Sequence, residues 1–120
     1  HPTSTPAYVS VPQHGLKYQS AAELKALLEY ENIDGAILDV REGREYRRAH
    51  IPVAKLLPLR KLMDESHSFP KERPIVLVCG AGRRSTRAAG ILQDLGFSNV
   101  HILKGGMLAW EAAGYPVMVE

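Results

Sequence analysis

The sequence predicts an α/β domain built on a mainly parallel sheet. Three observations carry this prediction. Segments typical of strands alternate with segments typical of helices along the chain, which is the pattern of a parallel sheet covered by helices. The run Ile75-Val76-Leu77-Val78 is apolar at every position, as expected of a strand that is covered on both faces. The 120 residues, 45% of them apolar, suit one small globular domain.

Residues 1–17 are expected to form a tail or linker in front of a domain that spans 18–118. They contain three prolines and mostly small or polar residues, with one short strand predicted at Tyr8–Val11. Because the chain begins His1-Pro2 without an initiator Met, we expect it to have been processed or excised from a longer protein.

The first helix is predicted to begin at Ser20. Ser20 and Glu23 have the spacing of a capping box, in which each side chain bonds a backbone N–H that the helix leaves free. Leu24, Leu27 and Leu28 then supply an apolar face at helical spacing.

The middle of the chain predicts four short elements. Ala36-Ile37-Leu38-Asp39-Val40 has the composition of a buried strand, and Ile51-Pro52 ends the helix after it because proline cannot continue a helix. The predicted elements are a strand at 36–40, a helix at 42–48, a strand at 54–58 and a helix at 60–65.

The last third predicts two strand–helix units. Gly96 and Gly114 stand where the two helices should stop, as glycine often does just past a helix end. The predicted elements are a strand at 75–78, a helix at 85–95, a strand at 99–103 and a helix at 106–113.

Composition excludes several classes of protein. The net charge of +2, without a basic stripe interleaved with aromatic residues, argues against nucleic acid as a partner. The apolar runs are far shorter than the roughly 20 residues of a membrane span. One cysteine rules out an intramolecular disulfide, and the five histidines lack ligand spacing, so neither a metal nor a cofactor is expected. We expect a cytoplasmic protein, although this composition also suits the periplasm.

The candidate nucleophile is Cys79, the only cysteine, at the end of the apolar strand. Gly80 and Gly82 permit backbone angles that other residues resist, so successive amides can point into one anion-binding concavity. The N-terminus of the next helix adds free N–H groups and a positive dipole end. We therefore expect the sulfur to be stabilised as the reactive thiolate.

The arginines after Cys79 strengthen this interpretation. Arg83, Arg84 and Arg87 crowd the start of a helix, where each cation is unfavourable by roughly 0.3–1 kcal/mol against the dipole. A local rule broken in this way indicates a functional site. The cations are understandable if an anion occupies the concavity.

The spacing after Cys79 distinguishes two chemistries. A cysteine phosphatase needs an arginine six positions after the cysteine, and here that residue is Ser85. Arg84, one position earlier, leaves only four residues between itself and Cys79. This smaller cradle suits a persulfide sulfur or thiosulfate better than a tetrahedral phosphate ester.

Several short motifs follow one another along the chain in a specific order and spacing. They are Leu38-Asp39-Val40-Arg41, Glu45-Tyr46, His50-Ile51-Pro52, Val76 to Arg84, Leu103-Lys104-Gly105-Gly106, Trp110 and Gly114-Tyr115-Pro116-Val117. In these motifs the sequence resembles the single-domain rhodaneses, or sulfurtransferases, over roughly residues 16–118. One departure is Val53, where the family usually has glycine, and we expect only a loop difference there.

This resemblance implies a five-stranded parallel sheet and a Cys79 nucleophile. The thiolate would take the outer sulfur of thiosulfate, or of a protein persulfide, and pass it to cyanide or a cellular thiol. Arg83 and Arg84 would attract and orient the donor anion. The substrate-binding residues implied are Gly80, Ala81, Gly82, Arg83, Arg84 and Ser85.

Two other functions stay open at this point. The domain could carry persulfide or sense redox state as a module of a larger protein, or it could be a phosphatase or arsenate reductase. Other polar and aromatic residues are expected to be structural: Asp39 at a strand end, His50, His101, and Trp110 with Met107 in the core.

Overall fold

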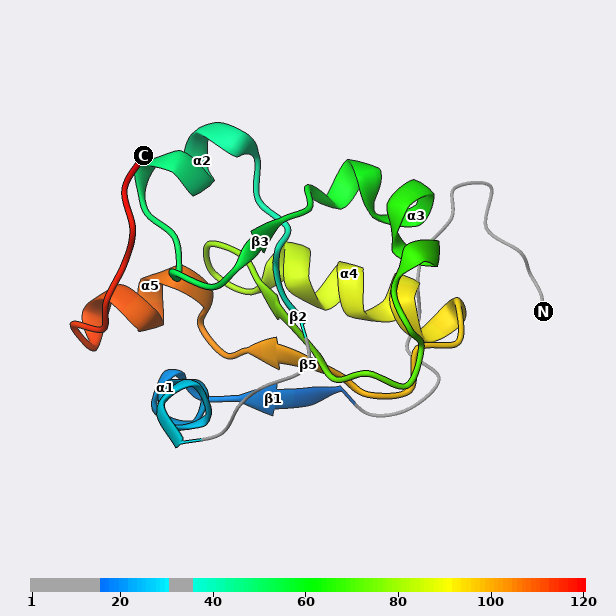
Figure 1. The fold of residues 1–120 in the computed structure, drawn as a ribbon, viewed down its shortest axis with the longest axis horizontal. Helices are drawn as coiled ribbons and strands as arrows, with labels where there is room; N and C mark the ends of the chain where they lie inside the picture. The colour runs from blue at the N-terminus through cyan, green and yellow to red at the C-terminus, as the bar shows by residue number, and fades with distance from the viewer. Residues whose placement is uncertain (1–15, 31–35) are drawn as a thin grey trace.

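The computed structural model describes residues 16–30 and 36–120, which form a five-stranded sheet in the order β1-β5-β4-β2-β3 (Figure 1). Every strand pairing in it is parallel, which confirms the predicted α/β class. The strands are β1 (Lys17–Gln19), β2 (Ala36–Asp39), β3 (Lys55–Leu56), β4 (Ile75–Val78) and β5 (Val100–Leu103).

The helices follow the predicted order with two differences. The last long helix before β5 begins at Arg83 instead of Ser85, and the range predicted as one helix at 60–65 is divided between two short helical segments. Among the strands, β1 was not predicted. The strand predicted at Tyr8–Val11 lies outside the described residues. The helices are α1 (Ala21–Tyr30), α2 (Gly43–Arg48), η1 (Leu59–Lys61), α3 (Leu62–Glu65), η2 (Ser66–Ser68), α4 (Arg83–Asp94) and α5 (Gly106–Ala112).

The side chains of β4 alternate between two apolar clusters. Ile75 and Leu77 belong to the cluster under α3 and α4, whereas Val76 and Val78 belong to the cluster under α1 and α5. Figure 1 shows the two helix pairs on opposite sides of the sheet. Both faces of β4 are therefore covered, as its unbroken apolar run predicted.

The strand order creates a crevice at the carboxyl ends of β2 and β4. The chain leaves β2 toward β3 at one edge, and it leaves β4 toward β5 in the opposite direction. In open α/β sheets, ligands bind outside the strand ends where the connections diverge in this way. The residues that follow β2 and β4 are therefore the first place to look for a site.

The ends of the chain's helices show how local sequence fixes the scaffold. Ser20 and Glu23 form the predicted capping box at the start of α1, with bonds of 3.0 and 2.8 Å.

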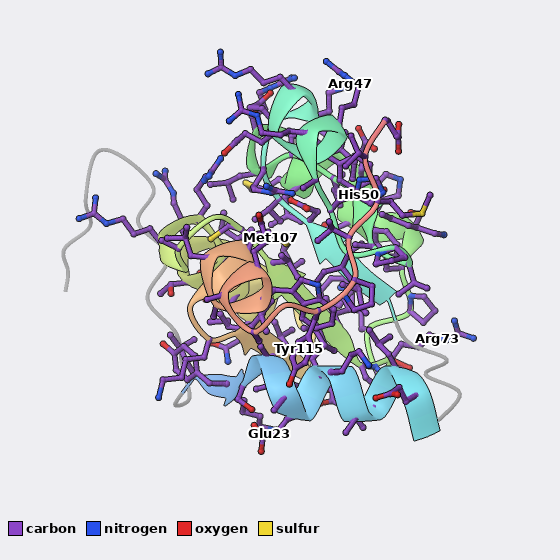
Figure 2. The ribbon with its side chains drawn as sticks, turned by 90° about the vertical axis from the view of Figure 1, so that its left-hand side faces the viewer. Glu23, Arg47, His50, Arg73, Met107 and Tyr115 are labelled. Carbon is purple, nitrogen blue, oxygen red and sulfur yellow. The ribbon has the colours of Figure 1, made fainter. Side chains whose placement is uncertain are left out.

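The indole N–H of Trp110 donates to the carbonyl of Pro116, so the segment after α5 turns back over the domain. In Figure 2 this segment runs from Tyr115 past His50, where Met118 forms a two-way backbone bridge.

Candidate active site

The central strand β4 delivers Cys79 to the crevice. Its four residues are all buried, and Cys79 follows at once with 1% of its surface exposed. Its side chain lies on the face of the sheet that α3 and α4 cover. A thiol held this firmly has little freedom to turn away from a reacting partner.

The loop after Cys79 folds its own backbone around the sulfur. The N–H of Gly82 donates to Sγ at 3.0 Å, and the N–H of Ser85 donates at 3.3 Å. Both groups belong to the N-terminal end of α4, where amides are free and the helix dipole is positive. The arrangement favours negative charge on the sulfur.

Gly82 makes this wrapping possible. Its φ of 113° is in the left-handed region, where a residue with a Cβ is strained, although no atom stands within 4 Å of a Cβ built there. The expectation of an unusual backbone is thus confirmed for Gly82. It is wrong for Gly80, which does not have a positive φ.

Helix α5 supports the loop from behind. The N–H of Met107 donates to the carbonyl of Cys79 at 2.8 Å, and that of Leu108 donates to Gly80 at 3.1 Å. A Cβ at Gly106 would collide with the Cys79 carbonyl and lie 2.6 Å from that of Gly80. Gly106, which the sequence analysis did not place in the site, therefore allows α5 to reach the loop.

The Arg84 side chain is bound to a carboxylate from another helix. Its Nη1 and Nη2 donate to the two oxygens of Glu45 on α2, at 2.7 and 2.9 Å. This hydrogen bond is the main reason why the pKa of Glu45 falls to about 2 and the pKa of Arg84 rises. Arg84 Nη2 also lies 3.3 Å from the position of a Cβ on Gly80, so the pair rests against the loop.

The remaining predicted residues divide between rim and interior. Arg83 and Ala81 are exposed, and Arg83 has no ion-pair partner in the described ranges. Ser85 is fully buried, and its hydroxyl has no hydrogen-bond partner among the described residues. The structure thus gathers Gly82 and Ser85 around the sulfur, sets Arg84 beside the loop and leaves Arg83 facing solvent.

Comparison with known proteins places this arrangement in a family. Residues 20–113 match the family described as the Rhodanese-like domain. The chain belongs to this family. It is 35% identical over 104 residues to the thiosulfate sulfurtransferase GlpE of Pseudoalteromonas translucida, covering 87% of this chain and 96% of that protein.

Solved structures agree with the rhodanese-like assignment. The crystal structure of the Alr3790 protein of Anabaena has a TM-score of 0.81 at 34% identity, covering 85% of this chain and 82% of that one. A Rhodopseudomonas palustris protein of unknown function, described as a possible tyrosine phosphatase, has a TM-score of 0.75 at 29% identity, covering 85% and 84%. The rhodanese-like fold is thus shared by proteins with different descriptions.

Asp39, at the end of β2, has a structural role in this rhodanese-like domain. Its carboxylate accepts bonds from the backbone N–H, Nε and Nη2 of Arg41, at 3.1, 2.9 and 2.8 Å. His50 is also structural, because it is buried, bonds the carbonyl of Tyr46 through Nδ1 and stacks on the Tyr46 ring. Trp110 and Met107 lie in the core, as predicted.

Two further features of the described ranges concern metals and membranes. These ranges contain no cluster of three or more His, Cys, Asp or Glu side chains that could hold a metal ion. None of their helices has both the length and the apolar character needed to cross a membrane.

Two site residues were missed by the sequence analysis. Glu45 was noted only as part of the family resemblance, since its partner Arg84 is 39 positions away and no local pattern joins them. Gly106 was likewise noted only as part of the family resemblance. The signal that could have found it is the pair Gly105-Gly106 directly before a helix, which is one glycine more than a turn requires.

Proposed function

We propose that this protein is a sulfurtransferase that moves a sulfur atom through a persulfide on Cys79. The observation that supports the proposal most strongly is the buried Sγ, which accepts N–H groups from Gly82 and Ser85 at the start of α4. The names of its sulfurtransferase relatives agree with this chemistry.

The reaction divides into two nucleophilic displacements. In the first, the Cys79 thiolate attacks the outer sulfur of thiosulfate, the S–S bond of the donor breaks, and its electron pair leaves with sulfite. In the second, an acceptor attacks the outer sulfur of the persulfide and the Cys79 thiolate is restored. Cyanide becomes thiocyanate, and a thiol becomes a persulfide.

The loop Gly80 to Ser85 would hold the anions of both steps. The amides of Gly82 and Ser85 replace the water lost from the buried sulfur. The exposed Arg83 would attract the donor to the mouth of the loop. Arg84 would act with Glu45 by fixing the loop's shape and by adding positive charge near the sulfur.

Intact-mass spectrometry after incubation with thiosulfate tests this function. We expect the protein to gain one sulfur atom, which is lost when cyanide is added, and Cys79→Ser to gain none. A folded wild-type protein that stays at its original mass would contradict the proposal and favour a role as a binding module.

A phosphatase is the second candidate, because one structural relative is described as a possible tyrosine phosphatase. The position six residues after Cys79 is Ser85, whose side chain is buried and uncharged. We therefore expect no hydrolysis of a simple aryl phosphate under conditions in which sulfur uptake is complete. Turnover of that ester, lost in Cys79→Ser, would reverse the order of the two candidates.

A further inference from the structure

A groove of about 740 Å³ is lined by Arg84 beside the Cys79 loop, and its other lining residues have no role in the reaction described above. It runs between the η1–α3 segment and α4, which cover the same face of the sheet (Figure 1). Its walls include Leu59, Met63 and Asp64 on one side and Arg84, Arg87 and Ile91 on the other.

The groove lies on the same face of the sheet as the side chain of Cys79. Val40 and Ile91 line it, and they belong to the same buried cluster as the Cys79 side chain. Arg84 also lines it, and Nη2 of the same side chain lies 3.3 Å from the position of a Cβ on Gly80 of the loop. A molecule lying in the groove would therefore have one end next to the Cys79 loop.

The groove is too large for the small substrates of the proposed reaction. Thiosulfate and cyanide are ions of a few atoms, whereas pockets of roughly 300–1,000 Å³ hold organic ligands of drug size. The Gly82 and Ser85 amides already provide a site for the small anion. The groove thus offers space for a larger second substrate.

Its charges indicate which chemistry that substrate has. Arg84 is paired with Glu45, and Arg60 with Glu42 at 3.2 Å. Arg87 on α4 is exposed and has no ion-pair partner in the described ranges, and the same is true of Asp64 on α3.

Part of the groove wall is apolar. Met63 is 56% exposed, and the partly buried Leu59 is another of the lining residues. A carboxylate, an ammonium group and a peptide-like body would match Arg87, Asp64 and the apolar wall, respectively.

We propose that this groove binds the sulfur acceptor, and that the acceptor is a small peptide thiol with a free carboxylate. The proposal rests on the sulfurtransferase function. The carboxylate pairs with Arg87, and the body of the peptide lies over Met63. The peptide's sulfur, after its proton leaves to solvent, attacks the outer sulfur on Cys79. The bond between the two persulfide sulfurs breaks, its electron pair returns to Cys79, and the peptide leaves as a persulfide.

Single-turnover discharge of the loaded protein tests this assignment, with glutathione as the probe. The protein is first loaded with thiosulfate, and the rate of sulfur loss is then measured with glutathione and, separately, with cyanide. Cyanide reports on the sulfur alone, because it is too small to need the groove. We expect Arg87→Glu to lower the ratio of the glutathione rate to the cyanide rate about tenfold, the loss expected for a charged hydrogen bond.

Two controls make the result specific. Arg48→Glu makes the same charge change at an exposed arginine on α2 outside the groove, and it should leave the ratio within about twofold of wild type. Esterifying the carboxylates of glutathione should slow wild-type discharge to a similar extent as Arg87→Glu, and should have little further effect in that variant.

The failures of the two proposals are distinguishable. If neither Arg87→Glu nor esterification changes the ratio, or if Arg48→Glu lowers it equally, the groove is not the acceptor site, even though Cys79 accepts and releases sulfur. If Cys79 takes up no sulfur, the loading step reveals it before any thiol is added, and the sulfurtransferase function itself is wrong.

Discussion

The loops after β2 and β4 follow the carboxyl ends of two neighbouring strands, and they bind a negatively charged group in different ways. After β2, the buried carboxylate of Asp39 accepts hydrogen bonds from both the guanidinium and the backbone N–H of Arg41. Nη2 of Arg41 also donates to the carbonyl of Ala49. After β4, the sulfur of Cys79 receives only two backbone N–H groups, and no side-chain cation is bonded to it in the described part of the chain.

This difference separates scaffold from site. The Asp39 carboxylate is fully buried and already paired with a guanidinium of its own chain, so we interpret the Asp39 loop as a support that holds the strand end in place. Backbone amides around a thiol stabilise an anion without pairing it with a side-chain cation. Damage to the first loop should therefore change stability, and damage to the second should change chemistry.

The largest effect is expected from Gly106→Ala, which damages the loop after β4 from behind. The new methyl group would overlap the carbonyls of Cys79 and Gly80, which are backbone atoms that cannot move without opening the loop. We expect a loss of more than about 4 kcal/mol of stability, an exceptional value for one substitution, together with loss of sulfur uptake. Urea denaturation and intact-mass spectrometry measure the two effects.

Gly114→Ala is the matched control for this substitution. Gly114 has a φ of 75°, similar to the 57° of Gly106, but a Cβ at Gly114 would have no atom within 4 Å. It should lose only the roughly 1–2 kcal/mol of left-handed strain and keep sulfur uptake. Equal losses in the two variants would mean that strain, and not contact with the Cys79 loop, makes Gly106 necessary.

The second prediction concerns the loop after β2. Asp39→Asn keeps the shape of the side chain but leaves the buried guanidinium of Arg41 without its charge partner. Removing one partner of a buried pair typically costs about 3–5 kcal/mol, and we expect a loss in this range. Sulfur uptake per folded molecule should stay close to wild type, because Asp39 does not contact the sulfur.

Arg60→Gln provides the comparison for a pair at the surface. Arg60 and Glu42 are both well exposed, so breaking their contact should cost about 0–1 kcal/mol. If Asp39→Asn instead lowered sulfur uptake in molecules that remain folded, the division between a scaffold loop and a reactive loop would be wrong.

The sequence predicted the parts of this fold that depend on local pattern. The apolar run of β4, the capping box of Ser20 and the glycine at position 82 each reveal their role within a few residues. It did not predict β1, whose three residues have no buried side chain and pair only with β5. A strand this short is defined by its partner, which comes more than 80 positions later.

For the site, too, the sequence predicted the features that depend on neighbouring residues and missed those that depend on distant ones. Cys79 and its amide loop follow from consecutive residues, whereas the bonds from Arg84 to Glu45 and from α5 to the loop depend on how distant elements pack. The sequence also indicated three arginines crowded at the start of α4, where the helix dipole disfavours a cation. The structure explains one of them, since Arg84 is balanced by a carboxylate from α2.

The smallest effect is expected from Glu45→Gln, which tests that balance. The variant keeps a hydrogen-bonding side chain but removes the charge opposite Arg84. If Glu45 positions Arg84 against the loop, the KM for thiosulfate should change by about two- to fivefold, while the rate of cyanide discharge from loaded Cys79 stays the same. A merely structural role would lower stability and leave the KM unchanged.

The pH dependence of stability gives an independent test of the same pair. The pKa of Glu45 is lowered to about 2 in the folded protein from its ordinary 4.5, so folding favours its ionised form. This contribution to stability is fully present above about pH 4.5 and disappears as the pH falls toward 2. Wild type should therefore be more stable than Glu45→Gln near neutral pH, and urea denaturation should show the difference shrinking below pH 4.5. A difference that is independent of pH would mean that packing, and not the charge of Glu45, holds Arg84 beside the reactive loop.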